Sequence, residues 1–216
     1  MRNRFDEQLS LLHQALSEMG AMCERAIART ARALGEGDPE LAKRVMDEGS
    51  GIDLKEQEIE EQCIKLLLHQ QPVAGDLRRI SAALKIITDM ERIGDQAEDI
   101  AELILELGGR NMEGVERIRE MAQATITMVT ESIHAYVEQD LELARVVEAQ
   151  DDVVDNYFLE MKEDIIRLVA RHPEEGAFAL DLLMIAKYFE RIGDHATNIA
   201  QWVIYAVTGE HKSLSV

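Results

Sequence analysis

The sequence contains few of the residues that interrupt helices or favour β-sheets. Its 216 residues include three prolines and only 4% aromatic residues. By contrast Leu, Ala, Ile, Met, Glu and Arg, which lose little side-chain freedom in a helix, are abundant. Because 46% of the residues are hydrophobic, the chain can also bury a core. We therefore expect an all-α fold.

Cysteines and long apolar runs are also scarce. The two cysteines, Cys23 and Cys63, lack CxxC spacing, so we expect reduced, small core residues rather than a disulfide. No apolar run approaches the roughly 18 residues that a membrane span requires, and residues 1–6 have no signal-peptide pattern. These absences predict a cytoplasmic protein.

Positive charge is in the minority. The chain has 23 Lys and Arg against 42 Asp and Glu, a formal net charge of -19. Nucleic-acid affinity rests on Lys and Arg that displace counterions from phosphates, so we expect no nucleic-acid partner. The excess of carboxylates indicates either a strongly solvated surface or bound cations, and the positions of the acids decide between them.

An internal repeat organises the chain. MERIGDQAEDIA at 90–101 is matched by FERIGDHATNIA at 189–200, 99 positions later, and Asp53 is matched by Asp155, 102 positions later. The chain therefore consists of two copies of one unit. The expected units are residues 1–109 and 110–216.

Capping residues and breakers divide each unit into three helices. Asp38 is an N-cap followed by Pro39, Gln71-Pro72 opens another helix, and Gly108-Gly109 closes the first unit. Long helices with short connections lie antiparallel, so we predict two tandem, pseudo-symmetric three-helix bundles. The same breaks argue against one extended coiled coil. The expected helices lie near 4–34, 39–69, 73–107, 111–137, 141–171 and 174–207.

Acidic residues recur one turn apart on the third and sixth expected helices, opposite an apolar stripe. Like charges at i and i+4 destabilise a helix by ~0.2–0.5 kcal/mol per pair, so a plain solvated face is a poor explanation. A bound cation would compensate directly, and oxygen ligands accept divalent or trivalent ions such as Mg, Ca, Mn, Fe or Zn. The second and fifth expected helices supply further acids. Together the candidate metal ligands are Asp53, Glu91, Asp95, Asp99, Asp151, Asp155, Glu190, Asp194 and Asn198.

The residues beside these acids have structural interpretations. Arg92 and Arg191 are expected to form ion pairs with neighbouring carboxylates. Gly94 and Gly193 cost a helix about 1 kcal/mol each relative to Ala, so we expect them where helices pack closely. His195 is expected to be a surface histidine that either flanks a metal site or is merely solvated, because no partner for a general base is in view.

Several segments together resemble the PhoU family of phosphate-transport regulators. They are the repeated ERIGD helix, Met19-Gly20, LAKRV at 41–45 and QPVAGDLR at 71–78, and the resemblance covers nearly the whole chain. It implies metal binding through Glu/Asp-xxx-Asp pairs. In this sequence the pairs are Glu91 with Asp95, Glu190 with Asp194, and Asp151 with Asp155.

The same resemblance implies partners and a role. The chain would dock on the ATPase subunit of a phosphate ABC transporter and on a phosphate-responsive sensor histidine kinase. It would thereby repress phosphate uptake and the phosphate-starvation genes. A homodimer is expected, which would reach the membrane only through its protein partners.

Gly49 departs from the family pattern. It stands four residues before Asp53, where the family commonly has an aspartate. The first site therefore lacks one possible ligand, with Glu48 or water as substitutes. We expect unequal metal occupancy of the two sites, with weaker binding at the first.

Two other interpretations remain open. A ferritin-like di-metal storage protein or oxidase also uses carboxylates on bundle helices, but it needs two Glu-x-x-His motifs, and this chain has one, Glu131 with His134. The third possibility is a helical adaptor that works without metal. Because no GxSxG, Walker or GxGxxG motif occurs, we do not expect an enzyme.

Overall fold

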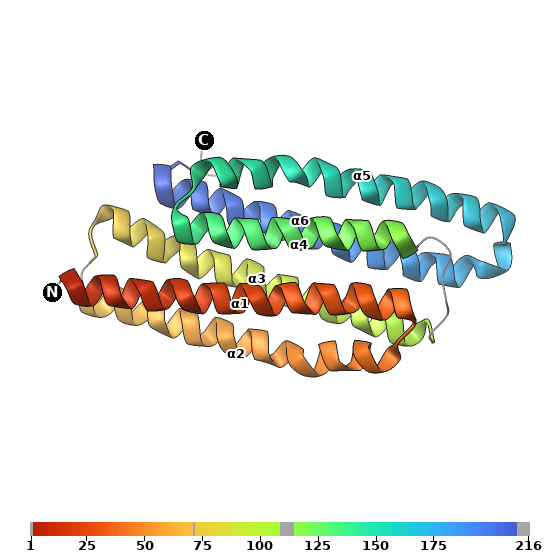
Figure 1. The fold of residues 1–216 in the computed structure, drawn as a ribbon, viewed down its shortest axis with the longest axis horizontal. Helices are drawn as coiled ribbons and strands as arrows, with labels where there is room; N and C mark the ends of the chain where they lie inside the picture. The colour runs from red at the N-terminus through yellow and green to blue at the C-terminus, as the bar shows by residue number, and fades with distance from the viewer. Residues whose placement is uncertain (1, 71, 109–114, 211–216) are drawn as a thin grey trace.

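The structure, a computed structural model, describes residues 2–70, 72–108 and 115–210. Within them the chain is helical without any strand, as predicted, and forms two three-helix bundles (Figure 1). The expected features at Gln71, at the 109/110 unit boundary and at residue 111 lie outside the described residues. The elements are α1 (Arg2–Glu36), α2 (Pro39–Gln70), α3 (Ala74–Glu106), α4 (Val115–Glu138), α5 (Leu141–Arg171), η1 (Pro173–Glu175) and α6 (Gly176–Thr208).

The start of the sixth helix differs from the prediction. A short 3-10 helix, η1, precedes α6, which begins at Gly176 rather than near 174. Proline disfavours helical backbone at the residue before it, and His172 has φ −132° and ψ 74°. Pro173 therefore ends α5 at Arg171, and the chain continues as the single turn of η1.

Aspartate caps fix the starts of α2 and α5. The Oδ1 atom of Asp38 accepts hydrogen bonds from the backbone N–H groups of Glu40 and Leu41 at 3.0 and 3.1 Å. Asp140 accepts one from Leu143 at 3.0 Å. Such a cap contributes ~0.5–2 kcal/mol. The predicted cap at Asp38 is confirmed, and the repeat carries an equivalent cap.

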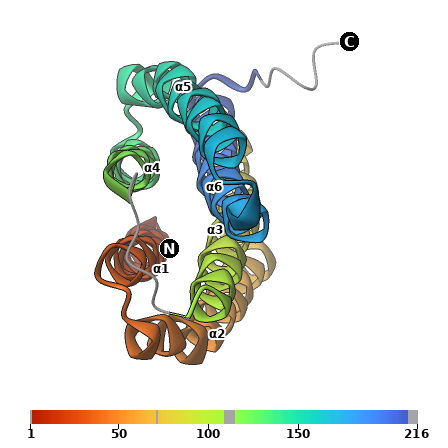
Figure 2. The same ribbon diagram turned by 90° about the vertical axis from the view of Figure 1, so that its right-hand side faces the viewer.

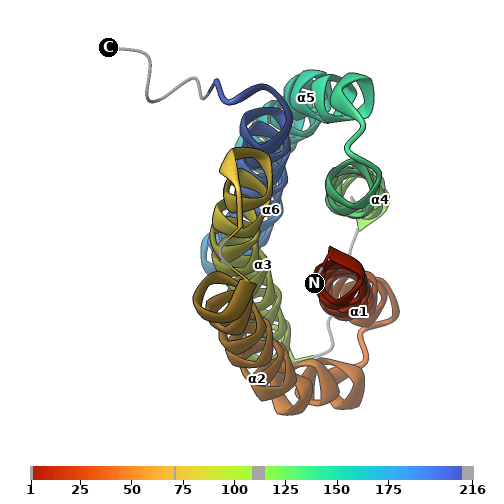
Figure 3. The ribbon, with the colours of Figure 1, turned by 90° about the vertical axis from the view of Figure 1, so that its left-hand side faces the viewer.

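The bundles share one core instead of standing apart. Helices α3 and α6 lie side by side, with α2 beyond α3 and α5 beyond α6, while α1 and α4 lie together on the opposite side (Figures 2 and 3). The buried apolar side chains of all six helices form one contiguous cluster. Among the described helices, none has the length and apolar character needed to cross a membrane.

Glycines allow the outer helices to approach the central pair. A Cβ atom at Gly94 would lie 3.0 Å from Ile52 Cδ1, and one at Gly193 would lie 3.2 Å from Val154 Cγ1. Ile52 and Val154 occupy equivalent positions of the repeat. The prediction that both glycines serve close packing is confirmed, and this packing sets α2 against α3 and α5 against α6.

Both cysteines are buried and free, as expected. The Cys23 thiol donates a hydrogen bond to the Met90 carbonyl at 3.4 Å. Burial raises the pKa of the Cys23 and Cys63 thiols to about 12. Because the thiolate is the reactive and metal-binding form, burial disfavours both cysteines as metal ligands or redox groups.

Gly94→Val tests the close packing of α2 on α3. Overpacking of a filled contact costs ~1–3 kcal/mol, so the free energy of unfolding should fall by about that amount in urea titrations. Gly75→Val on the same helix is the matched control, because a Cβ atom there meets nothing within 4 Å. Equal stability of the two variants would contradict the packing argument.

Candidate metal centres

The first cluster of carboxylates lies where α2 packs on α3. One side-chain oxygen from each of Asp53, Glu91 and Asp95 can be chosen so that all three lie within 4.8 Å of one another. Oxygens that bind one hard cation at ~2.0–2.6 Å lie no more than about 5 Å apart. The three side chains therefore fit a single cation without rearrangement of the helices.

Negative charge is concentrated around this trio. Partial burial raises the pKa of Glu91, and the neighbouring Asp95 raises it further. The same two causes, burial first and then nearby carboxylates, raise the pKa of three more groups on α2 and α3. They are Glu56, Glu98 and Asp99. Cations are therefore favoured here, because they would relieve repulsion that the metal-free protein must tolerate.

Arginine partly offsets this charge. Arg92 Nη1 lies 2.9 Å from Asp95 Oδ2, and Arg92 Nε lies 3.3 Å from Glu91 Oε2. The predicted ion pair of Arg92 is thus confirmed. Its side chain is 55% exposed, so the pairing is worth little, roughly 0–1 kcal/mol. The charge of Arg191 on α6 lowers the pKa of Asp99 on α3, and the expected ion pair of Arg191 stays a prediction.

The second cluster lies at the equivalent contact of α5 with α6. Burial first, and then Glu190 as the leading neighbouring carboxylate, raise the pKa of Asp155 and Asp194. Burial also raises the pKa of Asp151, where Asp155 is the leading neighbouring carboxylate and a hydrogen bond from Thr197 acts in the opposite direction. In the described residues, the three-oxygen grouping of the first cluster has no counterpart here. The second cluster therefore gathers the expected four carboxylates in a looser arrangement.

A lysine that sequence reasoning did not single out pairs with the second cluster. Lys187 forms an ion pair with Glu190, and its ammonium lies 5.2 Å from the centroid of the Phe158 ring. The only signal in the sequence was its i, i+3 spacing from Glu190. In the first cluster the equivalent positions hold Thr88 and Glu56, so the repeats differ in charge at this point.

Asn198 and His195 take part in a different contact. His195 Nδ1 lies 2.9 Å from Asp89 Oδ1, and the Asn198 amide donates to the same oxygen at 3.3 Å. These bonds join α6 to α3. Asn198 and His195 therefore both contact Asp89, and these contacts connect the two bundles. No pattern in the sequence pointed to Asp89, because Tyr188 stands at its equivalent in the repeat.

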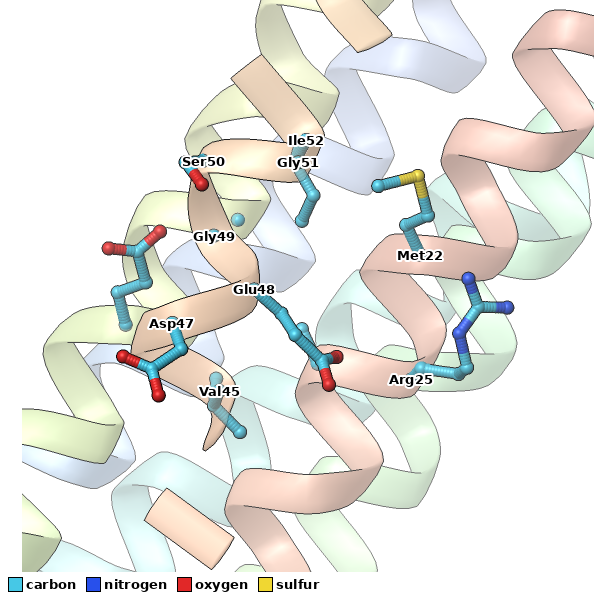
Figure 4. Close-up of a pocket in the computed structure, with 12 residues that line it drawn as sticks. Met22, Arg25, Val45, Asp47, Glu48, Gly49, Ser50, Gly51 and Ile52 are labelled. Atoms are coloured by element: carbon cyan, nitrogen blue, oxygen red, sulfur yellow. The ribbon is translucent and has the colours of Figure 1, made fainter. Parts of the chain in front are cut away.

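The expected substitute for the missing aspartate at Gly49 is directed elsewhere. Glu48 forms an ion pair with Arg29 of α1. Figure 4 shows Glu48 extending toward α1, beside a pocket of about 310 Å³ that α1, α2 and α3 line. Glu48 is thus paired with α1, and the expectation that Glu48 or water replaces the missing carboxylate stays a prediction.

A ferritin-like centre is disfavoured because such sites need carboxylates inside the bundle. The buried polar or charged residues among those described are uncharged: Thr30, Gln96, Thr125 and Ser132. The single Glu-x-x-His pair is not in the core either. Glu131 accepts a hydrogen bond from Gln150, and His134 is exposed.

Known proteins resemble this chain along nearly its whole length. A family model described as PhoU domain matches residues 16–104 and 118–203. The chain belongs to the PhoU family. A Clostridium acetobutylicum protein named phosphate-specific transport system accessory protein PhoU homolog is 36% identical over 216 residues, 99% of either chain. The two matched segments fall on α1–α3 and α4–α6, one on each unit of the repeat.

Solved PhoU structures have the same fold. A crystal structure of PhoU from Pseudomonas aeruginosa is similar with a TM-score of 0.90 and 32% identity, and the match covers 95% of this chain and 100% of that one. The phosphate transport system regulatory protein PhoU from Streptococcus pneumoniae is similar with a TM-score of 0.87 and 26% identity, over 95% and 98% of the two chains. The sequence-based assignment to the family and to an all-α fold is confirmed.

The raised pKa of Asp151 makes stability depend on pH. A carboxyl group whose pKa is raised by folding costs no stability below its unfolded value, here 3.8, and its full cost appears once the pH exceeds the folded value. The thermal midpoint of Asp151→Asn, relative to that of the wild type, should therefore rise as the pH increases from 4.5 to 7.5 in buffer that contains a chelator. Each kcal/mol corresponds to about 2–4 °C for a chain of this size.

The control for this comparison is Asp6→Asn, which removes one exposed negative charge from α1, outside both clusters. It corrects for the general effect of net charge on unfolding. A difference between Asp151→Asn and wild type that does not change with pH would contradict repulsion within the second cluster.

Proposed function

We propose that this protein is an accessory protein of a phosphate transport system, which represses phosphate uptake and the phosphate-starvation response. The observation that carries this proposal is similarity along nearly the whole chain to proteins named phosphate-specific transport system accessory proteins. The helices, the repeat and the acidic pairs all lie within the aligned length. The role is therefore assigned to the full six-helix unit rather than to one bundle.

Cation binding is the proposed chemistry of the acidic clusters. Asp53, Glu91 and Asp95 would hold one ion, and Asp151, Asp155, Glu190 and Asp194 would hold another, with Asp99 beside the first cluster. A bound divalent or trivalent ion supplies positive charge that neutralises the repelling carboxylates. Arg92 and Lys187 are the protein's own cations at these positions.

The proposed partners are the ATPase subunit of a phosphate ABC transporter and a phosphate-responsive sensor histidine kinase. The formal charge of -19 favours basic protein surfaces as partners and disfavours nucleic acid. We place the protein in the cytoplasm as a homodimer that reaches the membrane through these partners. No catalytic role is proposed for the chain.

A metal-independent adaptor is the second candidate. One observation favours it: Arg92 and Lys187 already pair with carboxylates of the two clusters. If these pairs suffice to neutralise the clusters, the helices can present a stable acidic surface without any ion. The two candidate functions predict different effects of removing Asp95 and Asp194 on repression.

Asp95→Ala combined with Asp194→Ala separates these candidates. If bound cations are needed, metal stoichiometry should fall to near zero, and phosphate-starvation genes should be expressed in phosphate-replete cells. Asp76→Ala with Asp181→Ala is the matched control, since these acids lie on α3 and α6 outside the clusters. Both double variants need the same helical content and the same amount in cells.

The readouts are elemental analysis of the purified protein, a starvation-promoter reporter, and co-purification with the transporter ATPase. Retained repression and ATPase binding in a metal-free Asp95→Ala, Asp194→Ala protein would support the adaptor. Loss of both, with the control unchanged, would support cation-dependent regulation.

A further inference from the structure

A groove of about 390 Å³ lies between α1 and α2, on the side of the first bundle away from the acidic cluster. Its floor is apolar and is formed by the buried side chains of Ala15 and Leu66, while Leu11 at its edge is 59% exposed. The lining residues of α1 run from Gln8 to Glu18, which is about 15 Å of helix. This α1/α2 groove is therefore long enough to take nearly three turns of another helix.

The second unit fills the equivalent space with one of its own side chains. Arg117 stands 102 positions after Ala15, the same spacing that relates α2 to α5. It crosses from α4 to α5, where its Nε lies 3.4 Å from Glu160 Oε2 and its Nη1 lies 2.5 Å from Asp164 Oδ2. Alanine at position 15 therefore leaves the first unit with an open groove where an arginine bridges the two helices of the second.

The charges that line the groove balance one another. Lys55 Nζ lies 2.8 Å from Glu18 Oε2 on α1 and 3.0 Å from Glu58 Oε2 on its own helix. With Lys65, the lining holds two ammonium groups and two carboxylates. The whole chain has a formal net charge of -19, so two copies that meet at random surfaces bring like charges together. At this groove two copies can approach without that repulsion.

The groove is also complementary to its own rim. Because α1 and α2 run antiparallel (Figure 1), Glu18 and Lys55 lie at one end of it and Lys65 lies towards the other. A two-fold axis between Leu11 and Ala15 would place Leu11 of each copy over Ala15 of the other. A large side chain then faces a small one, which lets the helices interdigitate. The same axis brings Glu18 of each copy towards Lys65 of the other.

We infer that the α1/α2 groove is the surface through which two copies of this chain associate. The inference rests on the proposed homodimer and names its interface. Leu11 is the apolar anchor, Ala15 and Leu66 form the surface that it covers, and Glu18 and Lys65 are the flanking charges. The contact is isologous, so it occupies the same groove on both copies and association stops at two chains.

A basic segment of another protein fits this groove less well than it fits the acidic clusters. An arginine placed as Arg117 is in the second unit would compete with Lys55, which already pairs with Glu18 and Glu58. An apolar side chain meets no such competitor at the floor of the groove. Leu11 of a second copy is therefore the better occupant.

The test is sedimentation equilibrium of the full chain, with a chelator present so that cations cannot bridge acidic surfaces. The parent protein should reach the mass of two chains as its concentration rises. Leu11→Arg should weaken dimerisation at least ~10-fold, because central apolar anchors carry most of the binding energy of an interface. Leu180→Arg is the matched control, since Leu180 on α6 is 62% exposed, and it should dimerise as the parent does.

A transplant of the second unit's arrangement closes the groove from within. Gln62 corresponds to Asp164, so Ala15→Arg with Gln62→Asp reproduces the arginine and its acid without a change in net charge. The double variant should also dimerise at least ~10-fold more weakly, because its own arginine occupies the space that Leu11 needs. Circular dichroism checks that its helical content equals that of the parent. If it does not fold, the comparison of Leu11→Arg with Leu180→Arg decides.

Failure of the inference differs from failure of the proposed homodimer. Parent-like dimerisation of Leu11→Arg would overturn the groove as the interface while leaving the homodimer in place. A parent that is monomeric in chelator but dimeric with Mn²⁺ would also overturn the groove, because cations would then join the copies. A parent that is monomeric in both conditions would overturn the homodimer itself. Loss of transporter ATPase from a monomeric Leu11→Arg protein, in co-purification, would assign the groove to another protein instead.

Discussion

Carboxylates that repel one another are held together because α2 packs closely on α3, and α5 on α6. Gly94 and Gly193 make this approach possible by leaving room for Ile52 and Val154. These apolar contacts hold the neighbouring acidic side chains close together, and the pKa values of Glu91 and Asp194 are raised as a result. Cation binding becomes favourable because the fold has already brought the negative charges together.

Much of the fold could be predicted from the sequence, because helices leave local signals. Asp38 and Pro39 set the start of α2, and the 3.6-residue period placed Glu91 and Asp95 opposite the core. Contacts between repeats leave no such signal. The pairing of α3 with α6 and the bond of His195 to Asp89 depend on tertiary packing.

Duplication explains how the two clusters can differ while the fold remains symmetric. Each unit preserves the glycine contact and the acidic pair on its third helix, since both belong to the packing of that helix. The surrounding positions are less constrained, so one cluster has Lys187 over Phe158 and the other has Thr88 beside Glu56. The two clusters therefore differ in charge although equivalent helices carry them.

The most direct measurement of cation capture is anomalous X-ray diffraction from crystals of the protein grown with Mn²⁺. Anomalous density is predicted between α2 and α3, within bonding distance of Asp53, Glu91 and Asp95, and between α5 and α6 beside Asp155 and Asp194. Density absent from both contacts, with these carboxylates directed into solvent, would contradict the central claim that the packed helices create cation sites.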